Sequence, residues 1–228
     1  MKHNLRMNLR SSANRLVDGA AGPISNYPVN VALAARGTLR KYRKGTVLIE
    51  EGDKGESVFV INSGRVKVFS VDAQAREITY AVLGAGDYFG EMSLDGGPRS
   101  ASVITMEAVE CSVLTHDQVR AFMAEHPEFA FELLSTVIRR AREATRTARG
   151  FALEGAYTRL VAFLENAGKR QPDGRLILEE ILTQQEIASR IGCGREMVSR
   201  MLKDLAAGGY VTLRARRYVV QRKLPVKW

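Results

Sequence analysis

The sequence has very few cysteines: Cys111 and Cys193 are the only two among 228 residues. They are too few for a disulfide framework or for a metal site with four ligands, so we expect two reduced thiols. Long apolar runs are also missing, because charge or glycine interrupts each one well before the roughly 18 residues that a membrane span needs. The basic stretch Met1–Arg15 has no apolar segment after it and does not resemble a secretory signal. We therefore expect a cytoplasmic protein with no membrane partner.

Histidine, a frequent catalytic residue, is sparse as well. The only histidines are His3, His116 and His126, and the sequence shows no nucleophile–base pair and no metal-ligand spacing. We expect no enzymatic activity and no bound metal. With 45% hydrophobic and 26% charged residues the composition is that of a globular protein, which excludes a disordered or rod-like chain.

The positive charge is concentrated near the C-terminus. The chain has 34 lysines and arginines against 25 acidic residues, for a net charge of +9. Residues 17–150 carry 16 basic and 17 acidic groups, whereas residues 191–228 carry nine and two. This distribution favours a polyanionic partner for the last part of the chain.

Short β-type runs separated by glycine-rich turns occupy residues 38–114. Many short strands at regular spacing are typical of an antiparallel barrel or sandwich. The predicted strands are Thr38–Tyr42, Thr46–Ile49, Ser57–Ile61, Arg65–Val71, Glu77–Leu83, Ala101–Thr105 and Ala108–Leu114. Residues 1–36 are interpreted as an extended arm and a short helix at about Val29–Ala35.

A long helix is predicted for residues 128–150, after a short one at Asp117–Glu125. Its apolar positions alternate in steps of four and three residues, the spacing of a helix that packs along a partner helix. This seam consists of Leu134, Ile138, Ala141, Thr145, Ala148 and Ala152. The adjoining row Leu133, Val137 and Ala144 allows the stripe to pack on its own barrel instead. We favour both contacts at once, the barrel on one side and a second copy of the chain on the other.

The C-terminal unit contains a helix-turn-helix pattern. Thr183 and Glu186 have capping-box spacing at the start of a helix that runs to Ile191. The turn Gly192-Cys193-Gly194 then precedes a second helix, Arg195–Leu205, and two short helices joined in this way are typical of the motif. Other elements predicted here are a helix at Ala156–Ala167, a polar turn at Lys169–Gly174 and a strand at Arg175–Leu178.

The second helix has a polar face that fits a DNA major groove. Its members are Arg195, Glu196, Ser199, Arg200 and Lys203, and such side chains can hydrogen-bond base edges. The alternative is that Glu196 and Arg200 only pair on a solvated surface, worth about 0.3–0.5 kcal/mol. A hairpin with a basic tip follows at residues 210–221, in the position of a wing, and with the basic C-terminus it favours DNA binding.

Charged residues also interrupt a stretch whose flanks are patterned as buried strands. Gly90-Glu91 and Arg99-Ser100 lie there, and buried charge needs a partner. One interpretation is an internal Glu91–Arg99 salt bridge. The other is a phosphate site, in which a glycine-rich helical turn presents backbone N–H groups, Arg99 adds a bidentate cation and Glu91 accepts from a ribose hydroxyl.

The order of these motifs resembles the cyclic AMP receptor protein (Crp/Fnr) family of bacterial transcription regulators. The resemblance covers residues 37–221 and rests on Gly-Glu, seven residues, Arg-Ser-Ala, the long helix, and then Thr-x-x-Glu and Cys-Gly-Arg-Glu-x-Val-x-Arg. It implies an α+β fold with an antiparallel, cupin-like β-roll at residues 37–127. A long dimerisation helix at 128–150 and a winged helix-turn-helix at 151–228 complete this expected fold.

The resemblance also implies a homodimeric, sequence-specific DNA-binding regulator controlled by a cyclic nucleotide. The implied ligand-binding residues are Gly64, Val66, Phe89, Gly90, Glu91, Met92, Ser93, Arg99, Ser100, Ala101, Ala144 and Thr145. The implied DNA-binding residues are Thr183, Gln184, Gln185, Arg195, Glu196, Ser199, Arg200, Lys203 and Arg216. The implied partners are palindromic double-stranded DNA, a second copy of the chain and RNA polymerase.

Three departures from the family pattern bear on the ligand and the half-site. Members that respond to cyclic AMP present Thr-Ser to the adenine, whereas Ala144-Thr145 stands here. Cyclic AMP is the expected effector, with cyclic GMP or cyclic di-GMP as alternatives. Cyclic di-GMP is included because arginines of the long helix can hold its second phosphate. These are Arg139, Arg140, Arg142, Arg146 and Arg149. Ser199 is the residue found at this position in the Fnr branch, so both TGTGA and TTGAT are candidate half-sites. The cysteine cluster of the Fnr branch is absent from this chain. A ligand-independent regulator with a structural Glu91–Arg99 pair is a further alternative.

Overall fold

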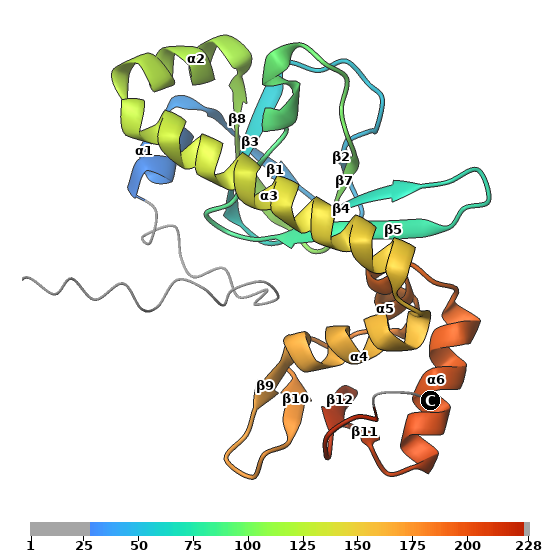
Figure 1. Cartoon of the computed structure of the whole chain (residues 1–228). Coiled ribbons are helices and arrows are strands. Elements are labelled where there is room, and N and C mark those ends of the chain that lie inside the picture. Colours follow the sequence, from blue (N-terminus) through green and yellow to red (C-terminus); the bar gives the residue numbers. More distant parts are fainter. Residues whose placement is uncertain (1–27, 226–228) are drawn as a thin grey trace, which may run out of the picture.

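A computed structural model describes residues 28–225, so the predicted basic arm lies outside the described residues. Figure 1 shows a β-roll, a long helix that lies across it, and a smaller domain at the C-terminal end of that helix. The short helix predicted before the roll is confirmed as α1 (Pro28–Arg36).

The roll consists of two four-stranded sheets with antiparallel pairing, as the strand pattern predicted. Their orders are β1-β8-β3-β6 and β2-β7-β4-β5. The strands are β1 (Thr38–Tyr42), β2 (Val47–Ile49), β3 (Ser57–Ser63), β4 (Val66–Val71), β5 (Glu77–Leu83), β6 (Tyr88–Phe89), β7 (Ser102–Thr105) and β8 (Val109–Thr115). Strand β6 was not predicted, because two residues are too few to show an alternating pattern.

Apolar side chains from both sheets fill the roll. Phe59 and Phe89 stack with their ring centroids 4.8 Å apart, and Val66 and Cys111 are fully buried in the same cluster. Both cysteines are free, as expected. Burial raises the pKa of the Cys111 thiol to about 12, so this side chain behaves as an apolar core residue.

Two helices follow the roll. Helix α2 (His116–Glu125) begins at a capping box between Thr115 and Gln118, and α3 (Pro127–Leu153) begins two residues after α2 ends. Helix α3 is longer than predicted: it continues through Gly150 and ends before Glu154, whose backbone is extended (φ −117°, ψ 137°). A single glycine lowers helix stability by only about 1 kcal/mol and does not stop a helix that is packed elsewhere.

The smaller domain has its own sheet and core. Its elements are α4 (Ala156–Ala167), β9 (Gly168–Arg170), β10 (Leu176–Leu178), α5 (Gln184–Ile191), α6 (Arg195–Ala207), β11 (Val211–Arg214) and β12 (Arg217–Val220). The sheet order is β11-β12-β10-β9. Helix α6 ends two residues later than predicted, and β9 includes Lys169 and Arg170, which were assigned to a polar turn.

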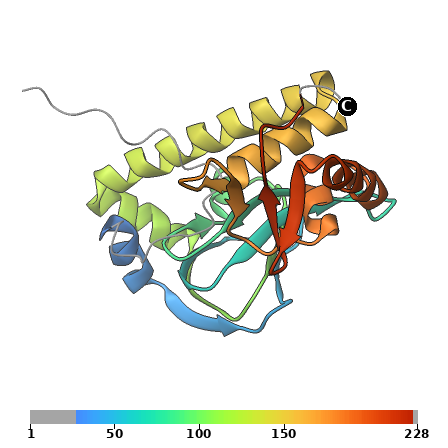
Figure 2. The same cartoon turned by 90° about the horizontal axis from the view of Figure 1, so that it is seen from below.

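Figures 1 and 2 agree on the position of α6, the second helix of the predicted helix-turn-helix. Helix α6 lies at the end of the molecule toward which the C-terminal end of α3 points, and it is seen nearly end-on in Figure 2. Among residues 28–225 no helix combines the length and the apolar character that a membrane span requires.

Gly64 is the glycine on which the roll depends most closely. Its φ is +82°, and a Cβ there would lie 2.3 Å from the Ala108 carbonyl oxygen, whereas Gly45 has φ +80° and nothing within 4 Å. We expect Gly64→Ala to lower the free energy of unfolding by about 3 kcal/mol or more, and Gly45→Ala by only about 1–2 kcal/mol, the strain of a left-handed alanine. Urea unfolding followed by circular dichroism measures both. Equal losses would show that contact with Ala108 is not the constraint.

Candidate functional site

The predicted phosphate site is built on a short 3-10 helix, η2 (Glu91–Asp95), directly after β6. Gly90 and Gly96 bracket this helix, and both have φ +85°, a left-handed conformation that favours glycine. In the described part of the chain, no side chain caps the N-terminus of η2. Its first backbone N–H groups are therefore open to an acceptor.

Arg99 lies beneath this turn and is only 7% exposed. Its Nη1 donates to the Gly90 carbonyl and to Ser93 Oγ, both at 2.9 Å, and its Nη2 donates to the Ser57 carbonyl at 2.8 Å. The other edge, Nε–H with the second Nη2–H, makes no hydrogen bond within the described residues. That edge faces Gly55, where a Cβ would lie 2.7 Å from Nη2. An edge with two parallel N–H groups is the one with which arginine binds phosphate.

Glu91 pairs with Arg140 of α3 and not with Arg99, so the alternative of a Glu91–Arg99 salt bridge is wrong. Arg140 Nη1 forms a hydrogen-bonded ion pair with Glu91 Oε1, and Nη2 donates to the Tyr88 carbonyl at 2.8 Å. The Glu91 side chain is only 2% exposed, so its charge needs this partner. Burial lowers the pKa of the Arg99 guanidinium, and the nearby charge of Glu91 opposes that shift.

Sequence reasoning missed the role of Arg140. It grouped Arg140 with four other arginines of the long helix, as groups that can hold a second phosphate. One feature of the sequence could have indicated this role, namely that Arg140 lies off the apolar seam. In the structure α3 lies across the roll (Figure 1). The pair joins residues 49 positions apart, which no local pattern reveals.

His116 was also missed. It is buried at the start of α2, and its Nε2 lies 3.2 Å from Ser93 Oγ. Burial lowers the pKa of His116, and the positive charges of Arg99 and Arg120 act in the same direction. A neutral imidazole thus packs beneath the turn.

The remaining roll residues predicted at the ligand divide into two groups. Phe89 and Val66 are core residues whose side chains are buried. Met92 and Ser100 are exposed and touch each other, with Ser100 Oγ 3.3 Å from Met92 Sδ, and Ala101 is half-buried. The structure therefore links Gly90, Ser93 and Arg99 directly, gives Glu91 a separate partner in Arg140, and leaves Met92 and Ser100 at the surface.

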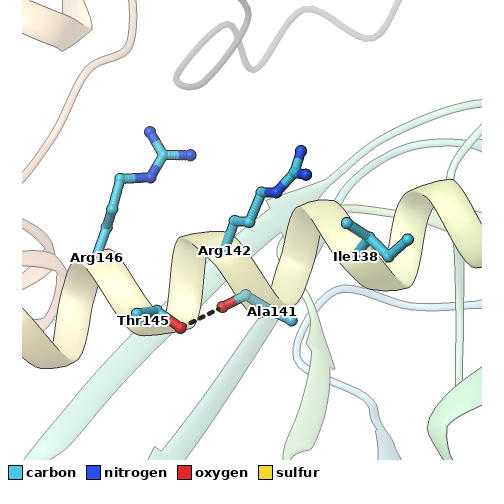
Figure 3. A pocket seen from close by; sticks show the side chains of 5 residues that line it. All are labelled: Ile138, Ala141, Arg142, Thr145 and Arg146. Atoms are coloured by element: carbon cyan, nitrogen blue, oxygen red, sulfur yellow. Dashed lines mark hydrogen bonds between the residues drawn. The ribbon is translucent and has the colours of Figure 1, made fainter.

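Ala144 and Thr145 are exposed on α3, and no hydrogen bond or ion pair links either of them to Glu91 or Arg99 in the described chain. Thr145 Oγ1 donates to the Ala141 carbonyl at 3.0 Å (Figure 3). A shallow hollow, widely open to solvent, lies on this helix and is lined by Ile138, Ala141, Arg142, Thr145 and Arg146. The guanidinium groups of Arg142 and Arg146 extend on the same side of α3 (Figure 3).

Helix α3 has two different apolar faces. Phe129 and Thr136 are buried, and Leu133 packs against the same core of the roll. The predicted roll-facing row of Leu133, Val137 and Ala144 is wrong for its last two members, because Val137 is 38% exposed and Ala144 is also exposed. The predicted seam is exposed in the single chain, with Leu134 at 55% and Ile138 at 41%. Phe131, at 74% exposed, continues the seam spacing toward the N-terminus. An exposed apolar row of this length is typical of an interaction surface.

The helix-turn-helix is formed as predicted by α5 and α6. Thr183 and Glu186 form the capping box at the start of α5, and Gly192, with φ +63°, ends that helix. The apolar face of α6 is buried at Val198, Met201, Leu202 and Leu205. Gln185 is exposed and Gln184 half-buried at the start of α5.

The polar face of α6 is open. Arg195, Glu196, Arg200 and Lys203 are exposed and Ser199 is half-buried. None of the four charged side chains makes an ion pair within residues 28–225, so the alternative, a Glu196–Arg200 surface pair, is not formed in this structure. These side chains are available to a partner.

The wing ends in a two-residue turn with strained backbone. Arg214 and Arg217 pair across the hairpin, and Ala215 and Arg216 between them have φ +47° and +64°. Such turns normally use glycine or asparagine, because other residues resist the left-handed region. The turn places the exposed Arg216 at the tip of the wing.

Comparisons with known proteins match both halves of this architecture. Residues 39–126 match the cyclic nucleotide-binding domain, and residues 158–224 match the Crp-like helix-turn-helix domain. A CRP-like cAMP-activated global transcriptional regulator of Mycobacterium tuberculosis is 30% identical over 183 residues, covering 78% of this chain and 82% of the relative. The chain belongs to the Crp/Fnr family. The cyclic AMP receptor protein of Thermus thermophilus is 36% identical over 175 residues, 76% of this chain and 79% of the relative.

Solved structures share the fold. The c-di-GMP responsive regulator CLP of Xanthomonas campestris superposes with a TM-score of 0.73 at 23% identity, over 84% of this chain and 97% of that one. A CooA mutant of Carboxydothermus hydrogenoformans gives 0.71 at 25% identity, over 83% and 85%. The predicted α+β fold is confirmed. This Crp/Fnr chain is a CRP-like transcriptional regulator with a cyclic-nucleotide-binding and a DNA-binding domain, and its family consists of regulators rather than enzymes.

The buried His116 predicts a pH dependence of stability. Because folding lowers its pKa below the ordinary value of about 6.5, the unfolded chain binds more protons. The free energy of unfolding should therefore fall as the pH drops below about 6.5 toward the folded pKa. Urea unfolding at pH 7.5 and 5.5 measures this change. Between these two pH values the free energy of unfolding should fall less for His116→Gln than for the natural chain.

The variant and the natural chain must be compared at both pH values, because burial raises the pKa of Glu132 and gives an effect of opposite sign. Identical losses in the two proteins would contradict this role of His116.

Proposed function

We propose that this Crp/Fnr regulator binds DNA as a homodimer, and that a cyclic nucleotide, with cyclic AMP as the first candidate, controls this binding from the β-roll. The observation that carries the proposal is the Glu91–Arg140 ion pair. It connects the turn expected to hold the nucleotide with α3, the helix that carries the exposed seam. A ligand that changes this pair acts directly on α3.

The turn offers the groups that a cyclic nucleotide needs. The uncapped N-terminus of η2 and the free edge of Arg99 supply donors for the phosphate. The Glu91 carboxylate can accept from a ribose hydroxyl when Arg140 shifts. The cAMP-activated relatives support cyclic AMP as the nucleotide.

A second effector, cyclic di-GMP, is favoured by one observation. Arg142 and Arg146 line the hollow on α3 and make no ion pair in the described chain, so they can neutralise a second phosphate. The structural neighbour described as c-di-GMP responsive adds support from the fold alone.

The dimer is supported by the exposed seam of α3. A parallel pairing of two such helices buries Phe131, Leu134 and Ile138, three large apolar side chains that water covers in the single chain. Thr145 continues that seam, so a second chain places this hydroxyl next to its own copy. The pairing also brings two α6 helices to the same end of the molecule, as a palindrome requires.

DNA recognition is assigned to α6 and the wing. Arg195, Glu196 and Arg200 are free to read base edges in the major groove, and Arg216 is free to contact phosphate. For the bound dimer we also propose RNA polymerase as a partner, on the strength of the relatives named as transcriptional regulators.

Nucleotide binding is tested by Arg99→Lys, which keeps the charge but removes the two parallel donors. We expect cyclic AMP to bind at least about tenfold more weakly in calorimetry, a loss of about 1.4 kcal/mol. Arg40→Lys makes the same change on an exposed arginine of β1 and serves as the control. Unchanged affinity in Arg99→Lys would contradict the site. Binding of cyclic di-GMP alone, lost in Arg142→Ala, would favour the second effector.

DNA recognition is tested by comparing Arg195→Ala with Arg216→Ala on palindromes of TGTGA and TTGAT half-sites. Arg195→Ala should reduce discrimination at one base pair by about 1–3 kcal/mol. Arg216→Ala should weaken binding to all sequences alike and lower the salt dependence. Fluorescence anisotropy at several salt concentrations measures both, with Arg43→Ala, an exposed arginine of the β1–β2 turn, as the control. A uniform loss for Arg195→Ala would instead assign that residue to a phosphate.

A further inference from the structure

The DNA-binding domain is docked on the β-roll of its own chain, where α5 contacts β5. Thr79 Oγ1 of β5 donates to Ser189 Oγ of α5 at 3.0 Å. Ser189 in turn donates to the Glu186 carbonyl within α5 at 3.1 Å and is only 3% exposed. The buried Ser189 hydroxyl of α5, the first helix of the helix-turn-helix, thus accepts a hydrogen bond from the β-roll.

A chain of charges crosses the same boundary. Arg65, just before β4, has Nη1 3.5 Å from Glu180 Oε1, and the other oxygen of Glu180 binds Arg190 Nη1 of α5 at 2.8 Å. Glu107 of the roll steadies Arg65, with Oε1 3.3 Å from its Nε. The side chains of Arg65, Glu180 and Arg190 are 34%, 30% and 14% exposed, so water screens these pairs less than fully exposed ones.

A third contact joins the helix-turn-helix to the end of α3. The ring of Phe151 packs on Gly192, where a Cβ would lie 2.5 Å from Cε1. Arg159 of α4 lies over the same ring, 5.2 Å from its centroid, and donates to the Ile191 carbonyl at 2.8 Å. The turn between α5 and α6 is therefore held by the last turn of α3 as well as by the roll.

The docked arrangement leaves the DNA-reading surface uncovered. The polar face of α6 is exposed, and α6 lies at the end of the molecule to which α3 leads (Figures 1 and 2). In a dimer whose axis runs along α3, two α6 helices at this end face the same DNA.

From these contacts we infer that Glu180 and Ser189 are positioning residues: they dock the DNA-binding domain on Arg65 and Thr79 of the roll in the orientation that binds the operator. The inference rests on the proposed function, since operator binding is the readout. It adds a direct connection between the roll and the DNA-binding domain, separate from the Glu91–Arg140 pair that joins the roll to α3.

Disulfide trapping tests the docked orientation in the full chain. Thr79→Cys and Ser189→Cys, combined with Cys193→Ser, place two thiols where the hydroxyl oxygens are 3.0 Å apart. We expect the disulfide to form under mild oxidation, and the oxidised protein to bind the palindrome within threefold of its reduced form at saturating cyclic AMP. Failure of the disulfide to form, or loss of operator binding on oxidation with recovery on reduction, would overturn the inference.

Undocking is the complementary experiment. Arg65→Ala and Glu180→Gln should each weaken operator binding at least tenfold. The double variant should bind the operator as well as Glu180→Gln alone, because both substitutions remove the same Arg65–Glu180 ion pair. Arg65→Lys should recover part of the loss. Lys41→Ala, which breaks the exposed pair with Glu110 in the roll, is the control and should change nothing.

Cyclic AMP affinity should stay constant in these variants, which separates docking from nucleotide binding. Operator affinities equal to those of the natural chain would overturn the positioning role. Failure of the proposed function gives a different result, because the natural chain would then bind no palindrome with any nucleotide. Disulfide formation would still report whether the two domains dock.

Discussion

The architecture of this protein depends on the ion pair between Glu91 and Arg140. A carboxylate that is almost completely buried at the base of a glycine-bracketed turn is stable only with a positive partner, and that partner comes from α3. Arg99 is held by backbone carbonyls and by Ser93, and so cannot replace it. The ion pair therefore couples η2 to α3, so that a displacement of either element changes the contact with the other.

Helix α3 carries this coupling to the rest of the molecule because each of its faces has a different task. One face packs on the roll through Phe129, a second presents the exposed seam with Phe131 and Leu134, and its last turn packs Phe151 on the helix-turn-helix. A shift of α3 thus reaches both the proposed dimer contact and the DNA-binding domain. The docking contacts of α5 with β5 add a second constraint on the same domain.

Local patterns predicted the elements that are long enough to show a period, and the motifs that are defined by short spacing. The roll strands, the capping box at Thr183 and the apolar face of α6 are examples. Strand β6 was missed because two residues show no alternation, and β9 because its sequence, Gly-Lys-Arg, is typical of a polar turn. The only partner for Glu91 that the sequence suggested was Arg99, as one of two interpretations, whereas the fold supplies Arg140 from a helix that crosses the roll. The contacts of Arg65 and Ser189 depend on how two domains meet, which no single segment encodes.

The central claim is that a nucleotide in the roll changes how strongly the dimer binds DNA. The most direct measurement is fluorescence anisotropy of a labelled palindrome titrated with the protein, without nucleotide and at saturating cyclic AMP, cyclic GMP or cyclic di-GMP. The account predicts that one of these ligands tightens binding at least tenfold, with two chains per palindrome. The same affinity with and without all three ligands, or binding of a single chain to one half-site, would contradict it.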